Sequence, residues 1–173
     1  GITYGDLLGE FNLRPFPLSP IGSLYGTSIS GSIYAKGQIT GPLSSLNTNF
    51  SLGIVNPQIS GLRLQEEWRG DFSGKVGEGG IVRLASVGAS VPGNVSASFN
   101  KNWLLNELSI QRLGGNISLS RVKEGFSWEA DDFRLDRIEV ALSPEKSFKR
   151  IFGQLSGNGR LAPNPFELDG ELR

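Results

Sequence analysis

The sequence predicts an all-β fold, in which a long, curved antiparallel or mixed sheet is rolled into an open apolar groove with at most one or two short helices. The clearest observation is the segment 62–76, where every second residue is mostly apolar or glycine and the residues between are polar or charged. This period of two places the two sets on opposite faces of a strand. Similar alternation recurs along most of the chain, and very little of it has helical spacing. Because an apolar sheet face must be buried, the sheet has to close on itself or hold an apolar ligand.

Frequent glycine and changes in the phase of the alternation favour a curled sheet. The chain of 173 residues contains 24 glycines, which fit many turns and bulges. The expected strands differ in length and change phase, and a sheet with such irregularities curls instead of stacking flat. A groove with an apolar inside and a polar outside is the predicted result. An ordinary β-sandwich, with two sheets packed about 10 Å apart, is the alternative.

The composition indicates a folded section of a longer protein. Hydrophobic residues make up 38% and charged residues 20% of the chain, which is typical of globular proteins. Lys plus Arg and Asp plus Glu number 17 each, so the net charge is +0 and the basic stripe needed for nucleic-acid binding is missing. The chain has no Met and begins without the pattern of a signal peptide. We therefore expect any membrane anchor or targeting signal to lie outside this sequence.

The residue types of most enzymes and metal sites are missing. Without His there is no Ser-His-Asp arrangement and no imidazole ligand, and without Cys there is no thiol chemistry. The adjacent carboxylates Glu66-Glu67 and Asp131-Asp132 do not form a glycosidase pair, because neighbours on a strand point to opposite faces. We therefore expect no enzyme, no catalytic residue, no metal and no cofactor.

The chain is predicted to be a single β-groove segment over residues 1–173, with residues 1–26 as an irregular lead-in. Three prolines within the stretch 13–20 exclude a central strand, because each removes a backbone donor from the ladder. This stretch is expected to form an extended edge or a loop. Ile21 and Leu24 are spaced for one helical turn directly after it.

Regular alternation then predicts two strands. The first covers 27–39 and is followed by a turn at Gly41-Pro42. The second covers 46–54 and is expected to end at Asn56-Pro57.

Irregularities are predicted at several later positions. Glu66 falls on the apolar face of the strand over 62–76, which predicts a bend or bulge there. In the segment 81–91 apolar residues occupy both odd and even positions, so the sequence does not decide which of them face the inside of the sheet. Phase changes near Asp131-Asp132 and Asp136-Arg137 predict bulges. The segment 144–152 has Pro at its first position and apolar residues at helical spacing, which predicts a short helix.

Three segments resemble a known family. They read GSIYAKGQITGPL at 31–43, preceded by LSPI at 18–21, then GFSWEA and FRLDRI within 125–138, and IFGQLSGNGRL at 151–161. Their succession of glycine, polar and apolar residues is similar to the repeated segments of TamB-like proteins, which belong to the AsmA-like, bridge-like lipid-transfer proteins. The style is closest to cyanobacterial members and their chloroplast envelope relatives.

The resemblance implies a long envelope protein that is anchored in the inner membrane by an N-terminal helix and extends through the periplasm. Its sheet would form a taco-like groove that carries phospholipids between the inner and outer membranes and so supports outer-membrane biogenesis. The implied partner is an outer-membrane β-barrel assembly protein. The implied location of the present chain is the periplasmic portion of that protein. The periodicity itself supports only the trough.

The expected ligand is a phospholipid or another acyl-chain lipid, and no nucleic acid is expected to bind. Membrane association would come from regions outside this chain. The predicted lining of the groove consists of the apolar residues on one face of the alternating strands, namely Ile29, Ile33, Ile39, Phe50, Leu52, Ile54, Leu62, Leu64, Trp68, Phe72, Val95, Phe99, Ile117, Leu119, Phe126, Trp128, Val140 and Leu142.

Two other functions fit the same pattern. A structural or adhesive β-sandwich or β-solenoid module would have a closed interior that takes up no hydrophobic dye. A chaperone for outer-membrane β-barrel assembly would add client strands to the edge of its sheet, so changes at the edge would matter more than changes inside.

Overall fold

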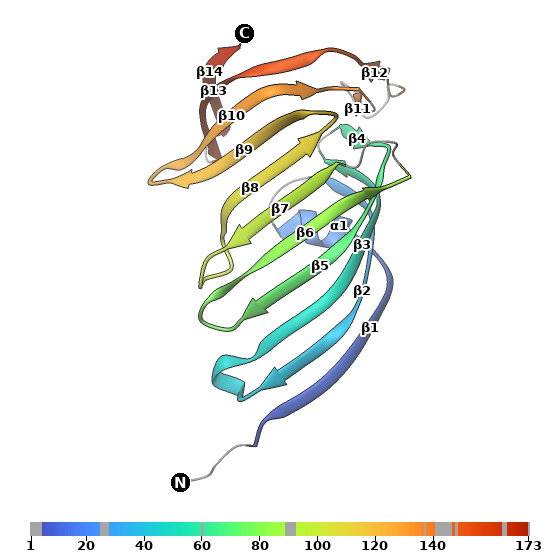
Figure 1. Cartoon of the computed structure of the whole chain (residues 1–173), viewed down its shortest axis with the longest axis vertical. Coiled ribbons are helices and arrows are strands. Elements are labelled where there is room, and N and C mark those ends of the chain that lie inside the picture. Colours follow the sequence, from blue (N-terminus) through green and yellow to red (C-terminus); the bar gives the residue numbers. More distant parts are fainter. Residues whose placement is uncertain are drawn as a thin grey trace.

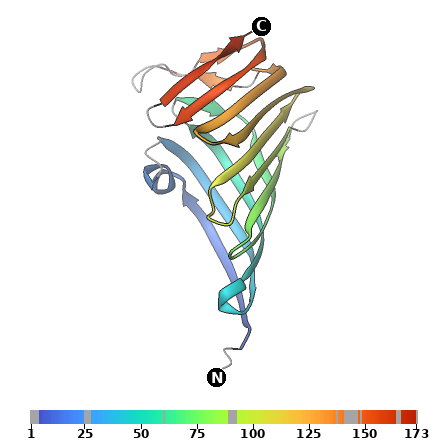
Figure 2. The same cartoon turned by 90° about the vertical axis from the view of Figure 1, so that its left-hand side faces the viewer.

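The computed structural model shows one large antiparallel sheet with very little helix (Figures 1 and 2). It describes residues 5–24, 28–59, 61–88, 93–136, 138–140, 147, 149–163 and 166–172, without the side chains of residues 21, 22, 24, 59, 163, 166–168 and 172. The sheet is a strongly curled, open half-barrel, which confirms the predicted fold class. All strand pairs in the described part of the chain are antiparallel.

Strands dominate the order of elements along the chain. The elements are β1 (Leu7–Pro17), α1 (Ser19–Leu24), β2 (Ile29–Gly41), the 3-10 helix η1 (Leu43–Ser45), β3 (Asn47–Ile59), β4 (Leu62–Leu64), β5 (Glu67–Lys75), β6 (Gly79–Val87), β7 (Asn94–Phe99), β8 (Leu105–Arg112), β9 (Gly115–Val122), β10 (Gly125–Arg134), β11 (Ile138–Val140), β12 (Lys149–Ile151), β13 (Gln154–Pro163) and β14 (Phe166–Leu172).

Most strands pair with a neighbour in sequence, so most of the sheet consists of consecutive β-hairpins. From β5 to β10 each strand pairs with the next, β13 and β14 continue the sheet, and β1 and β2 extend it beyond β3. Four connections, at 42–46, 76–78, 100–104 and 123–124, lie at the same end of the strands and follow the left side of Figure 1. We call this end the open margin and the opposite end the closed margin.

At the closed margin the sheet returns on itself. β3 pairs with β5 through residues 47–54 and, farther along the same side, with the short β4 through Gln58 and Ile59. β4 pairs in turn with β11, which follows β10 in the chain. A circuit of strands therefore runs from β3 through β5 to β10 and returns through β11 and β4. At this margin the chain connection from β10 to β11, and not a pairing of these two strands, completes the circuit, and the other margin is open.

Four strand pairs of the described residues have a register shift, and two of these shifts bear on the sequence predictions. Asn56 has a φ of 49° and lies near Gly31, which has a φ of 110°, where the register between β2 and β3 shifts. The strand that was expected to end at Asn56-Pro57 bulges there and continues to Ile59. Pro57 is tolerated because β3 changes from β5 to β4 at this point, so no ladder donor is required on that side. The second bulge lies between Ala130 and Phe133 and confirms the irregularity predicted from the sequence.

The predicted strand over 62–76 consists of two strands, β4 and β5, which are separated at Gln65 and Glu66. This break confirms the irregularity that the position of Glu66 predicted. The helix predicted over 144–152 is wrong at its C-terminal end, where Lys149–Ile151 form β12. Pairing of Ile151 with Ile138 in the sheet outweighs its helical spacing. The start of that predicted helix lies outside the described residues.

The N-terminal lead-in is more regular than the sequence predicted. β1 covers Leu7–Pro17 and pairs with β2 alone, so it is an edge strand, as its prolines require. The short helix α1 follows at Ser19–Leu24, where the sequence predicted one helical turn.

Burial is shallow throughout the described part of the molecule. Nine apolar residues are buried, and no described side chain is less than 2% exposed. The accessible surface is 11491 Å² for a chain of 18.6 kDa. A compact monomer of this mass exposes about 8,200 Å². The excess arises because one curled sheet, with no second layer among the described strands, leaves both of its faces partly in contact with water.

Candidate functional site

The inner face of the sheet carries continuous apolar rows that cross the strands. Residues that lie directly opposite one another in neighbouring strands point to the same face. One such row crosses eleven strands and contains Phe11, Gly37, Phe50, Phe72, Val82, Ala97, Leu108, Leu119, Trp128, Gly159 and Gly170. The next row crosses ten strands and contains Leu13, Ala35, Leu52, Gly70, Leu84, Val95, Ile110, Ile117, Ala130 and Gly157.

The opposite face is polar along the same strands. The row between the two apolar rows contains Asn12, Lys36, Ser51, Asp71, Arg83, Ser96, Ser109, Ser118, Glu129, Asn158 and Glu171. Most of these side chains are exposed, whereas all members of the apolar rows except Leu13 and Gly170 are buried or half-buried. Curling a sheet crowds the side chains on its concave side, so this difference places the apolar rows inside the half-barrel.

The buried centre of the inner face consists of two clusters. Ala35, Leu52, Trp68 and Leu84 form the first, and apolar side chains from β1 to β7 pack against it. Ala130, Phe133 and Ile138 form the second, near the closed margin. Leu64 of β4 contacts both clusters, so the inner face is continuous from the open trough to the closed circuit.

The predicted lining residues divide between these clusters and the rim. Leu52 and Trp68 are buried in the first cluster, with exposed fractions of 6% and 2%. Leu62 is 48% exposed, so it contributes little to a lining. Half-buried members that pack on the clusters are Ile33, Phe50, Ile54, Leu64, Phe72, Val95, Ile117, Trp128 and Val140. Half-buried members outside the clusters are Ile29, Ile39, Phe99, Leu119 and Phe126. Leu142 lies outside the described residues.

Sequence reasoning missed part of the lining. Phe11 of β1 packs against the first cluster and lies edge-on to Phe50, with ring centroids 5.4 Å apart. Phe50 stacks on Phe72 at 4.5 Å, and Phe72 stacks on Trp103 at 5.9 Å, so an aromatic series extends toward the open margin. The alternation of Gly9, Phe11 and Leu13 could have predicted a strand here with Phe11 on the inner face. The prolines that follow favoured a loop or an edge instead.

A buried ion pair lies at the closed margin. Arg112 Nη2 is 2.6 Å from Glu66 Oε1, and their side chains are only 3% and 6% exposed. Arg112 also donates to the carbonyl oxygens of Arg134 and Asp136, at 3.1 and 2.7 Å. These bonds tie β8 to the break between β4 and β5 and to the connection between β10 and β11. Arg112 therefore joins three parts of the closed circuit.

The polar groups around this pair are incompletely satisfied. Within the described residues, Glu66 Oε2 and Trp68 Nε1 are buried without a hydrogen-bond partner. A buried polar atom without a partner is costly, so these two atoms offset part of the stability that the ion pair contributes.

Ion pairs on the outer face hold carboxylates in their charged form. Arg69 and the Tyr34 hydroxyl donate to Glu67 and lower the pKa of its carboxyl group. Arg63 donates to Glu139, with help from Gln65, and lowers the pKa of Glu139 in the same way.

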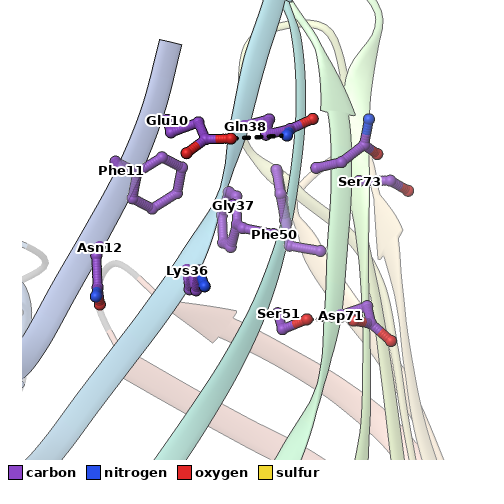
Figure 3. A pocket seen from close by; sticks show the side chains of 12 residues that line it. Glu10, Phe11, Asn12, Lys36, Gly37, Gln38, Phe50, Ser51, Asp71 and Ser73 are labelled. Atoms are coloured by element: carbon purple, nitrogen blue, oxygen red, sulfur yellow. Dashed lines mark hydrogen bonds between the residues drawn. The ribbon is translucent and has the colours of Figure 1, made fainter.

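The outer face is also hollowed, over β1, β2, β3 and β5 (Figure 3). The hollow has a volume of about 780 Å³, and eight of its twelve lining residues belong to the polar rows of the outer face. Glu10 accepts a hydrogen bond from Gln38 on one side, and Ser51 donates to Asp71 on the other. The other four lining residues, Phe11, Gly37, Phe50 and Phe72, belong to the eleven-strand row. The polar pairs that border the hollow make it a poorer match for an acyl chain than the apolar rows of the inner face.

The described residues include no cluster of three or more potential metal-ligating side chains. In the same part of the chain, no helix has the length and apolarity needed to cross a membrane. Comparison of the chain with protein-family models, curated proteins and solved structures finds no match.

Proposed function

We propose that this chain holds the acyl chains of phospholipids, or of similar lipids, against the inner face of its half-barrel. In this proposal it is a section of a periplasm-spanning, bridge-like envelope protein that carries phospholipids between the inner and outer membranes. Its anchor in the inner membrane and its contact with an outer-membrane β-barrel assembly protein belong to other regions. The proposal extends the resemblance of the sequence to TamB-like proteins.

The observation that carries the proposal is the uncovered inner face. The apolar rows cross ten and eleven strands. Side chains of β4, β11 and β12 pack on them near the closed margin, and elsewhere the described strands supply no second layer, so most row members stay only half-buried. An apolar face of this extent in contact with water marks a binding surface in a soluble domain. The same observation favours a trough over a β-sandwich, because a sandwich requires two stacked sheets.

The binding mechanism would be passive. Burying apolar surface contributes about 25 cal/mol per Å², or about 0.8 kcal/mol per methylene group. Because every member of the two rows is apolar or glycine, a chain that slides by one methylene exchanges one set of apolar contacts for another. The lining therefore retains the lipid without fixing its position, and the headgroup stays in water.

A charge placed in the lining tests this mechanism. Leu119 lies in the eleven-strand row and is half-buried, whereas its neighbour Ser120 points to the outer face and is exposed. We expect native mass spectrometry of the gently purified protein to show bound lipid in the wild type and in Ser120→Asp. In Leu119→Asp we expect little or none, because a charged group on an apolar wall repels an acyl chain.

Circular dichroism of both variants controls for folding. If folded Leu119→Asp retains as much lipid as the wild type, the inner face is not the binding surface. If the wild type neither co-purifies with lipid nor takes up a hydrophobic dye, the proposed function is wrong.

A further inference from the structure

The long strands of the sheet place two basic residues on its otherwise apolar inner face. Arg112 is buried and paired with Glu66 at the closed margin. Arg121 lies near the open end of β9, directly opposite Phe126, and is exposed. Because it is exposed, Arg121 keeps contact with water while its side chain lies on the same face as the apolar rows.

The side chain of Arg121 is held in place on this wall. Its guanidinium carbon lies 4.9 Å from the centroid of the Phe126 ring, and its Nε donates to the carbonyl oxygen of Leu105 at 2.5 Å. A guanidinium group has five N–H donors, so most of them are not used by these contacts. No carboxylate of the described residues forms an ion pair with Arg121. The group is therefore a positioned cation with donors to spare.

Arg121 stands at the boundary between apolar wall and water. Two residues back along β9 lies Leu119, which is flanked in its row by Leu108 and Trp128. In the other direction β9 ends at Val122, and the turn at 123–124 belongs to the open margin. The spacing between Arg121 and Leu119 is one two-residue repeat, about 6.7 Å. A ligand that combines a charged head with an apolar chain has this arrangement.

We propose that Arg121 binds the anionic head of an acyl-chain amphiphile, a phosphate or a carboxylate, while the chain lies over Leu119, Leu108 and Trp128. This inference rests on the proposed function and adds a headgroup preference to it. A guanidinium group matches both anions because it presents two parallel N–H donors to two oxygens. Because the guanidinium group of Arg121 is already stacked on Phe126, its side chain loses less conformational entropy when the anion binds.

Amphiphiles with one chain and different heads test the inference. Binding of dodecyl phosphate and of dodecyl maltoside, below their micelle-forming concentrations, is measured by titration calorimetry. We expect the wild type to bind the phosphate about fivefold more tightly, which is the upper range for an exposed ion pair. Arg121→Gln should lose this preference and keep its affinity for the maltoside. Arg83→Gln, on the exposed outer face of β6, is the matched control and should behave as the wild type.

Each outcome decides a different point. Equal affinity for the two amphiphiles in the wild type, or a preference that survives in Arg121→Gln, overturns the inference and leaves the proposed function intact. Failure of the wild type to bind either amphiphile overturns the proposed function as well. Inorganic phosphate is the third probe: if it displaces dodecyl phosphate at similar concentration, the site recognises a free anion and the headgroup assignment is wrong. Unchanged urea unfolding of Arg121→Gln shows that the loss of preference is not a loss of fold.

Discussion

Removal of Arg112 is expected to be the most destabilising single change at the closed margin. In Arg112→Met, the carboxyl group of Glu66 loses its ion pair at 2.6 Å in a site where its side chain is 6% exposed. Breaking a buried ion pair in this way costs about 3–5 kcal/mol. The carbonyl oxygens of Arg134 and Asp136 also lose a charged donor. Because a small domain is stable by only about 5–15 kcal/mol, the expected loss is a large fraction of the total.

Urea unfolding followed by circular dichroism measures this loss. Arg112→Met should lower the free energy of unfolding by about 4 kcal/mol. The double variant Glu66→Leu/Arg112→Met should recover about half of this loss, because it removes the buried unpaired carboxyl group but not the unpaired carbonyl oxygens. Arg83→Met, at an exposed site, should change stability by no more than about 0.5 kcal/mol. A loss below about 1 kcal/mol in Arg112→Met, or no recovery in the double variant, would show that the pair does not hold the circuit together.

Two further predictions concern the row of aromatic residues and the outer face. In urea unfolding, Gly37→Ala should destabilise the protein by about 1–3 kcal/mol, because its new methyl group meets the backbone of Asn49 and the side chain of Phe50. Gly9→Ala is the control, because no atom lies within 4 Å of the added methyl group there. Equal losses in the two variants would contradict the close approach at Gly37. Glu139 has a lowered pKa in the folded protein, so its ion pair with Arg63 stabilises the fold above the ordinary value of 4.5 and loses this effect as the pH falls through the lower folded value. The melting temperature should therefore fall less between pH 7 and pH 3 in Glu139→Gln than in the wild type. An equal fall in both proteins would show that Glu139 does not contribute to the loss of stability in acid.

The alternation of residue types predicted the faces of the sheet well. Trp68, Gly70 and Phe72 occupy one face of β5, as expected from a period of two, and the phase change at Asp131-Asp132 is a bulge. These features are local, because each depends on neighbours in sequence and on the geometry of one strand.

The closed margin was not predictable in the same way. Glu66 and Arg112 are 46 residues apart in sequence, and the short strands β4 and β11 pair across an even longer interval. Alternation within one strand carries no information about which distant strand it meets. The sequence showed only that Glu66 was out of place on an apolar face. Its partner became visible once the strands were arranged in space.

The one-sided closure has a consequence for how the molecule moves. Within the described residues, β1 and β14 are each joined to the sheet by a single neighbour, while the circuit fixes the strand ends at the opposite margin. Small changes of twist, summed over the strands between them, alter the separation of these two edges at low energetic cost. The width of the half-barrel between these free edges can therefore change while the closed margin keeps a constant shape. If the inner face binds lipids as proposed, this freedom would let it accept acyl chains of different width.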